Sequence, residues 1–218
     1  YLSPLYSRVY SYGSRLLLQN CPRQKVELMS QISTLRTAVV VEDSVVSKLG
    51  FVIGGIFFLA AMAQISFPIP GSPVPVTGQT LGALLIGTAY GSSLGFTTLF
   101  FYLLAGISGA PIFTGHTSGI DHLSGATGGY LVGMLVSSFV TGYLASRKWD
   151  QKIATVIPTM LIGTAIIFSF GLVWLQHRTG QSWGWTFSKG FTPFLLGEVL
   201  KIAIASTAFP TLWKFVRK

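Results

Sequence analysis

The sequence predicts an all-α integral membrane protein, a bundle of six transmembrane helices with both termini in the cytoplasm. Three observations support this fold class. Half of the residues are hydrophobic and only 10% are charged, whereas soluble domains carry about 25% charged residues. Residues 49–120 contain no Asp, Glu, Lys or Arg, and a bilayer is the natural solvent for so long an uncharged stretch. The basic residues, finally, gather on one side of the predicted helices.

The six spans follow from the rule that a helix crosses the hydrocarbon core with about 20 apolar residues. They are predicted at residues 49–67, 76–90, 94–107, 131–145, 153–175 and 191–213. The first span ends at the turn formed by residues 68–71, which contains two prolines and a glycine. Only Gly91-Ser92-Ser93 separates the short second and third spans, which predicts a tight helical hairpin.

The distribution of basic residues tests this number of spans, because Lys and Arg near the ends of spans favour the cytoplasmic side. With six spans, one side of the membrane receives eight basic residues: Arg36, Lys48, Arg147, Lys148, Lys152, Lys214, Arg217 and Lys218. The other side receives two, Arg178 and Lys189. This asymmetry supports an even number of spans and cytoplasmic termini. The net charge of +9 is therefore a topology signal, and we do not expect a nucleic-acid partner.

The first 46 residues differ in composition from the remainder. Residues 1–46 are predicted to form a basic, Ser-rich amino-terminal extension ahead of a transmembrane domain at residues 47–218. An organelle transit peptide has this composition, and a cytoplasmic extension that lies on anionic lipid is an equal alternative. The multi-pass protein is accordingly expected either in a bacterial plasma membrane or in an organelle envelope, plastid or mitochondrial.

Two charged residues lie within the sixth predicted span. Glu198 and Lys201 are three residues apart, so they share a face of the helix and can pair. Ionisable groups at membrane depth are costly and usually mark ligand or ion pathways. We interpret this pair as part of a binding site, with a self-satisfied ion pair that tightens the bundle as the alternative.

Gln79 lies at the start of the second span, after the proline-rich residues 73–75. Thr77 is predicted to cap the helix that follows. A Gln at this position offers both hydrogen-bond donors and an acceptor to a ligand. An interhelical hydrogen bond, which is common in membrane bundles, is the alternative interpretation.

Residues 109–130 connect the third and fourth spans and are rich in glycine. So long a loop without secondary structure is more often functional than a simple connector, and we interpret it as a lid over a binding site. The spacing of His116, Asp121 and His122 fits no strong metal-ligand motif. We therefore expect no metal and no cofactor, and we expect both histidines to be solvated in the loop.

Four ordered segments together resemble the BioY family of biotin transporters. They are Pro73–Gly82, Tyr102–Phe113, Gly125–Gly133 and Pro193–Lys201, and the resemblance extends over residues 49–213. Two departures stand out. Ala126 replaces the usual proline of Gly-Pro-Thr-Gly-Gly, which loosens the lid. Glu198 replaces the usual Asp, so that the carboxylate lies one methylene further from the backbone.

The resemblance implies a substrate-capture subunit, the S component of an energy-coupling factor transporter. Such a subunit binds biotin in the bilayer and assembles with a transmembrane coupling protein and two ATPase subunits. The sequence has no Gly-x-x-x-x-Gly-Lys-Ser/Thr loop, so ATP hydrolysis would be on the partners. No enzymatic activity and no catalytic residue are expected. Whether such a chain also works without the coupling module is open.

The resemblance also suggests a set of substrate-binding residues. Polar side chains would serve the ureido ring, aromatic side chains would form apolar walls, and Lys201 would face the carboxylate or anchor Glu198. The expected residues are Gln79, Tyr102, Phe113, Ser124, Thr127, Tyr130, Phe194, Glu198 and Lys201.

Three other functions are alternatives to a biotin-capture subunit. The same architecture serving another small vitamin is the nearest alternative. A purely structural membrane protein would use Glu198 and Lys201 only for packing. An intramembrane protease is disfavoured, because Gly106-Ile-Ser108-Gly109 fits a serine-protease pattern but no predicted span carries a histidine to act as its base.

Overall fold

The computed structural model describes residues 34–39 and 44–216. Most of the predicted amino-terminal extension, residues 1–33 and 40–43, lies outside the described residues, so the prediction for residues 1–46 stays a prediction. Within the described part, a short helix α3 (Leu35–Val39) contacts helices α5 and α11 of the bundle. Thr34 and Leu35 are buried there.

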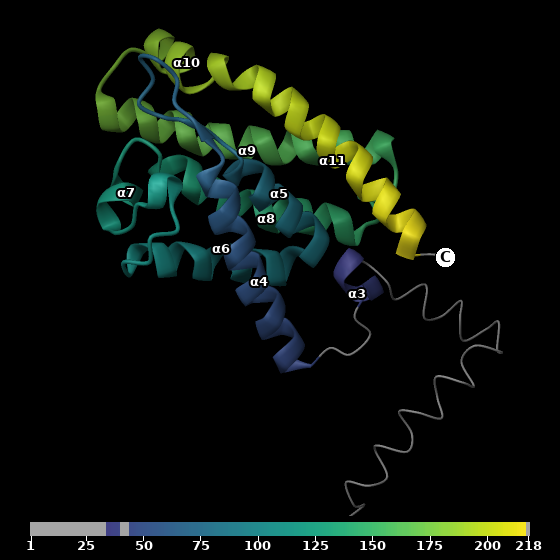
Figure 1. Ribbon diagram of the computed structural model, residues 1–218. Helices are drawn as coiled ribbons and strands as arrows, with labels where there is room; N and C mark the ends of the chain where they lie inside the picture. The colour runs from purple at the N-terminus through teal and green to yellow at the C-terminus, as the bar shows by residue number, and fades with distance from the viewer. Residues whose placement is uncertain (1–33, 40–43, 217–218) are drawn as a thin grey trace, which may run out of the picture. The chain divides into compact units, whose positions relative to one another are not determined.

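The described chain is almost entirely helical (Figure 1). After α3 the helices are α4 (Val45–Gln64), α5 (Gln79–Tyr90), α6 (Ser92–Ile107), α7 (Ile120–Ser124), α8 (Gly128–Ser146), α9 (Ile153–Thr179), α10 (Trp183–Gly190) and α11 (Leu195–Val216). Two 3-10 turns, η1 (Thr114–His116) and η2 (Thr192–Phe194), precede α7 and α11. Strands β1 (Ser66–Phe67) and β2 (Val76–Thr77) form a small antiparallel pair, with Ser66 opposite Thr77.

Helix α8 is the central helix, because it packs against α5, α6 and α9. Helix α4 packs on α5 and α6, and α11 packs on α9. Small residues allow the closest of these approaches: a Cβ atom at Gly87 of α5 would lie 2.5 Å from the carbonyl oxygen of Ser138 in α8. Helices in a bilayer have no hydrophobic driving force for association. Close contacts between their backbones therefore stabilise the bundle through van der Waals packing.

Large apolar side chains cover the outside of the bundle, as expected for a protein in lipid. Phe57 of α4 is 71% exposed and Leu196 of α11 is 84% exposed. Among the described helices, four segments are long and apolar enough to cross a membrane: Val45–Gln64, Gly128–Ser146, Ile153–Thr179 and Trp183–Val216. The protein is therefore a multi-pass membrane protein, and the predicted all-α membrane bundle is confirmed.

The six predicted spans correspond in order to α4, α5, α6, α8, α9 and α11, with shifted boundaries. Helix α6 is apolar but has 16 residues, and α5 has only 12. Both are shorter than the roughly 20 residues that a straight crossing requires. The number of six crossings and the cytoplasmic position of both termini thus stay predictions.

Two local predictions were wrong, and one helix was not predicted. Residues 109–130 are not free of secondary structure, because they contain η1 and α7. Thr77 does not cap α5: the residue before the helix is Gly78, with no side-chain hydrogen bond. Helix α10 was not predicted, because its eight residues are too few for a span. The side chain of Ser182 caps it by accepting a hydrogen bond from the backbone N–H of Trp185.

Candidate functional site

A cavity lies between the bundle and the loop of residues 109–127, hereafter the lid. Its empty space is about 440 Å³ with the open solvent at its mouth included, and the part that a water-sized molecule can occupy is about 30 Å³. The residues that line it come from the segment before α5, from α5, the lid, α8, α9, η2 and α11. They are Val74, Pro75, Thr77, Gln79, Thr80, Thr114, His122, Thr127, Tyr130, Leu131, Met134, Phe168, Phe194 and Lys201. A mostly apolar wall with a few placed polar groups is typical of small-molecule sites.

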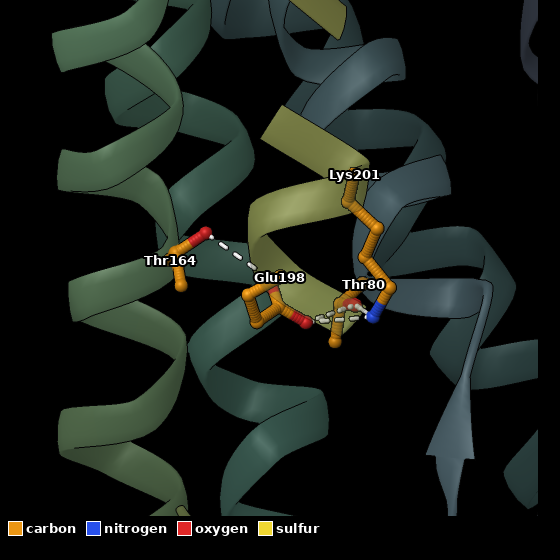
Figure 2. A network of polar contacts seen from close by, with 4 residues as sticks. All are labelled: Thr80, Thr164, Glu198 and Lys201. Atoms are coloured by element: carbon orange, nitrogen blue, oxygen red, sulfur yellow. Dashed lines mark hydrogen bonds and ion pairs between the residues drawn. The ribbon is translucent and has the colours of Figure 1, made fainter. Parts of the chain in front are cut away.

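Glu198 and Lys201 form an ion pair on one face of α11, as their spacing predicted (Figure 2). The Nζ atom of Lys201 lies 2.6 Å from Oε1 of Glu198 and donates a second hydrogen bond, of 2.7 Å, to Oγ1 of Thr80. The hydroxyl of Thr164 donates to Oε2 of Glu198 at 3.3 Å. Glu198 is 5% exposed and Lys201 is 9% exposed. Buried charges persist only when they are paired and hydrogen-bonded, and α5, α9 and α11 together supply those partners.

Gln79 and Tyr102 link α5 to α6 and to the start of the lid. The Nε2 atom of Gln79 donates to the Tyr102 hydroxyl at 2.9 Å, and that hydroxyl donates to the carbonyl oxygen of Ile112 at 2.8 Å. Tyr102 is 1% exposed. These two bonds do not use the Oε1 atom of Gln79, which remains an acceptor on a residue that lines the cavity. Gln79 therefore makes the interhelical hydrogen bond that was its alternative interpretation, and it also lines the cavity.

An aromatic wall closes another side of the cavity. The Tyr130 ring stacks on Phe194, with centroids 6.4 Å apart, and meets Phe168 edge-on at 5.9 Å. The Tyr130 hydroxyl donates a 2.9 Å hydrogen bond to the carbonyl oxygen of Gly190, which ties α8 to α10. A Cβ atom at Gly171 would lie 2.3 Å from the Tyr130 ring. Only glycine at this position of α9 lets the ring occupy its place.

Phe113 and His122 bring the two halves of the lid together. Their rings stack with centroids 4.9 Å apart and an interplanar angle of 18°. Phe113 is fully buried against Gly106 of α6, where a Cβ atom would lie 2.2 Å from the Phe113 ring. The indole N–H of Trp174 in α9 donates a 2.8 Å hydrogen bond to the carbonyl oxygen of Gly125, which fixes the far end of the lid.

Gln64, at the end of α4, holds the middle of the lid. Its Nε2 atom donates to the carbonyl oxygen of Phe113 at 3.0 Å, and its Oε1 atom accepts from the backbone N–H of His116 at 3.1 Å. One side-chain amide thus satisfies two backbone groups around η1. This role of Gln64 was not predictable from the sequence, because its partners lie about fifty positions along the chain.

The expected site residues fall into three groups. Gln79, Thr127, Tyr130, Phe194 and Lys201 line the cavity. Tyr102, Phe113 and Glu198 lie behind that lining and hold Gln79, His122 and Lys201 in place.

Ser124 falls outside the lining. Its hydroxyl donates to the carbonyl oxygen of Asp121 at 3.3 Å.

The two lid histidines differ from each other. His116 is exposed, as expected. His122 is half-buried and lines the cavity, so the expectation of a solvated side chain was wrong for this residue. Thr80 and Thr164 were also missed, because a threonine in an apolar helix carries no signal until its partner is known. Among the described residues, no group of three His, Cys, Asp or Glu side chains could hold a metal ion.

Comparisons with known proteins agree with this architecture. Residues 29–218 match the family model described as "BioY family". The chain is 37% identical over 158 residues to "Biotin transporter BioY2" of Lactococcus lactis subsp. cremoris, covering 71% of this chain and 83% of that protein. It is 34% identical over 143 residues to "Probable biotin transporter BioY" of Pyrococcus horikoshii, covering 66% and 82%. The crystal structure of the S-component for biotin from an ECF-type ABC transporter has the same fold, with a TM-score of 0.69 at 22% identity over 78% of this chain and 92% of that one.

Proposed function

The chain belongs to the BioY family, and from this membership we propose that it binds biotin in the membrane as the substrate-capture subunit of a transporter. One observation carries the proposal: a relative that bears the name of a biotin transporter is matched over 83% of its length. The cavity under the lid supplies the chemistry that such a function needs.

The polar and apolar groups of the cavity suit the parts of biotin. An ammonium group has three donors, and Lys201 uses two of them for Glu198 and Thr80. The third is available to a ligand acceptor, such as the carboxylate of biotin. Phe168 and Phe194 offer apolar walls to the thioether ring and the aliphatic chain.

Transport requires an energy source that this sequence does not contain, because it has no phosphate-binding Gly-x-x-x-x-Gly-Lys-Ser/Thr loop. We propose that a transmembrane coupling protein and two ATPase subunits supply it, in keeping with the ECF-type transporter to which the solved neighbour belongs. The membrane would be a bacterial plasma membrane or an organelle envelope. In the second case, residues 1–46 would act as the targeting segment.

Biotin binding to the purified, detergent-solubilised chain tests the proposal, with desthiobiotin and thiamine as comparators. We expect saturable, biotin-selective binding and a ligand-dependent rise in unfolding temperature, because a ligand that binds only the folded state stabilises it. Gln79→Ala and Lys201→Ala should both weaken binding, whereas Lys214→Ala, at an exposed position of α11, should not. A folded chain that ignores biotin but binds thiamine would overturn the choice of substrate. A folded chain stabilised by no vitamin would favour a structural role.

A further inference from the structure

His122 has a fixed position at the edge of the cavity. Its ring is held from one side by the stack on Phe113, which is itself fully buried. In the described part of the chain, the cavity lining places His122 and Thr127 on the lid side, whereas the charged lining residue, Lys201, comes from α11. The cavity therefore has polar groups on the lid as well as on the bundle, where Gln79 and Thr80 of α5 also line it.

The hydrogen bonds around His122 favour a hydrogen on the Nδ1 atom of its ring. The Nδ1 atom lies 2.9 Å from Oγ1 of Thr117. The Thr117 hydroxyl has a single hydrogen, which it donates to the carbonyl oxygen of Thr114 at 2.9 Å. When that hydrogen goes to Thr114, Thr117 accepts from His122, and this arrangement places a hydrogen on Nδ1. Burial lowers the pKa of His122 from its ordinary value, which favours the neutral ring. In that form Nε2 is an acceptor.

Of the two ring edges of His122, the Nε2 edge is the one that lies beside another residue of the cavity lining. Thr127, next to Nε2, lines the cavity, whereas Thr117, next to Nδ1, does not. The contact from Nε2 to Oγ1 of Thr127 is 3.5 Å, and the same hydroxyl lies 3.4 Å from the carbonyl oxygen of His122. Both distances are beyond the usual range of a strong hydrogen bond, and one hydrogen cannot serve both acceptors fully. Nε2 is thus an oriented acceptor at the cavity without a strong donor.

We propose that His122 determines ligand specificity: its Nε2 atom accepts a hydrogen bond from a ureido N–H of biotin, while Lys201 faces the carboxylate. This inference rests on the proposed function, and it assigns the orientation of the ligand. Biotin is suited to it, because its N–H donors and its carboxylate lie at opposite ends of the molecule. A carboxylic acid of similar length without an N–H donor at its far end would leave Nε2 unpaired, and unpaired buried polar groups are the strongest source of discrimination.

Substitutions at the two lid histidines test the assignment. His122→Phe keeps a ring to stack on Phe113 and removes the acceptor, and it should weaken biotin binding about tenfold, the effect of one lost hydrogen bond. His122→Gln offers an amide oxygen near the position of Nε2 and should recover part of the loss. His116→Phe, at an exposed position of the same lid, is the matched control and should bind as the unchanged chain does.

Ligand analogues show which end of biotin His122 contacts. We expect the loss caused by His122→Phe to persist with biotin methyl ester and to vanish with one of the two N-methylated ureido analogues, which lacks the N–H in question. A loss that vanishes with the methyl ester instead would assign His122 to the carboxylate end and overturn the proposal. Unchanged biotin affinity in both His122→Phe and His122→Gln would overturn it too.

Two further results distinguish a failure of the proposed function from a failure of the role proposed for His122. If the unchanged chain does not bind biotin, then the proposed function fails rather than the role of His122. If the unfolding temperature of ligand-free His122→Phe falls strongly, the binding of biotin and its analogues is measured with His122→Gln instead. Equal losses for all analogues in that variant would show a purely structural role and overturn the proposal.

Discussion

The indole N–H of Trp213 donates a 2.6 Å hydrogen bond to Oδ2 of Asp150, which joins the end of α11 to the loop between α8 and α9. Both residues are buried, and Asp150 has no exposed surface. Trp213→Phe removes one donor from a buried carboxylate, so we expect the free energy of unfolding to fall by about 1–3 kcal/mol. A lower unfolding temperature in detergent measures this effect. Trp183→Phe, at a position 49% exposed, is the control, and an equal decrease there would contradict the prediction.

Glu198→Gln should be strongly destabilising, because it leaves the ammonium of Lys201 buried without its counter-charge. Removing one partner of a buried ion pair typically costs about 3–5 kcal/mol. The double variant Glu198→Gln with Lys201→Met should be more stable than Glu198→Gln alone, since no unpaired charge remains, yet it should bind biotin poorly. The unfolding temperatures of the unchanged chain, Glu198→Gln, Lys201→Met and the double variant together form a double-mutant cycle. Additive effects in that cycle would show that the pair is not coupled.

Gly106→Ala should displace the lid. A Cβ atom at this position would lie 2.2 Å from the ring of Phe113, so the ring must shift, and we expect its stack with His122 to be disturbed. We expect a lower unfolding temperature and weaker biotin binding. Gly54→Ala in α4 is the matched control, because nothing lies within 4 Å of its added Cβ. If both variants behaved alike, the close packing under the lid would not matter for the site.

Biotin binding should weaken at acidic pH through His122. The pKa of His122 in the folded chain lies below its ordinary value because of burial, so the ring is neutral at pH 7. An Nε2 acceptor is lost on protonation, and affinity should be constant above about pH 6.5 and fall as the pH drops through the lowered pKa. The other titratable groups nearby are His116 and Asp121 in the lid and Tyr130 and Lys201 across the cavity.

Binding measured between pH 5 and 8 checks this prediction. The decrease should be absent in His122→Phe and retained in His116→Phe. A decrease that both variants retain would assign the titration to another group.

Much of the fold was predictable, because hydropathy alone marks helices in a bilayer. The ion pair of the site was predictable for a similar reason: Glu198 and Lys201 combine membrane depth with a spacing of three, and both signals are local. Gln79 was predictable as a ligand candidate, although the sequence could not show that Tyr102 orients its amide.

Contacts between distant segments were not predictable. The position of His122 depends on how η1 and α7 pack on the bundle, and a glycine-rich loop has no hydrophobic periodicity from which to predict this packing. The same holds for Gln64 and Phe113, which meet across 49 positions of sequence. Helix α10 was not predicted because hydropathy marks helices long enough to cross the bilayer, and eight residues cannot cross it.

The amide of Gln64 makes the lid a kinetic element as well as a wall. We expect biotin to enter and leave past the lid after the hydrogen bonds from Gln64 to Phe113 and His116 have broken together, since one side chain makes both. Substitutions at Gln64 should therefore shorten the residence time of the ligand by raising the association and dissociation rates in parallel. At high biotin concentration, we then expect the rate of capture to depend on how often the end of α4 releases the lid, rather than on diffusion.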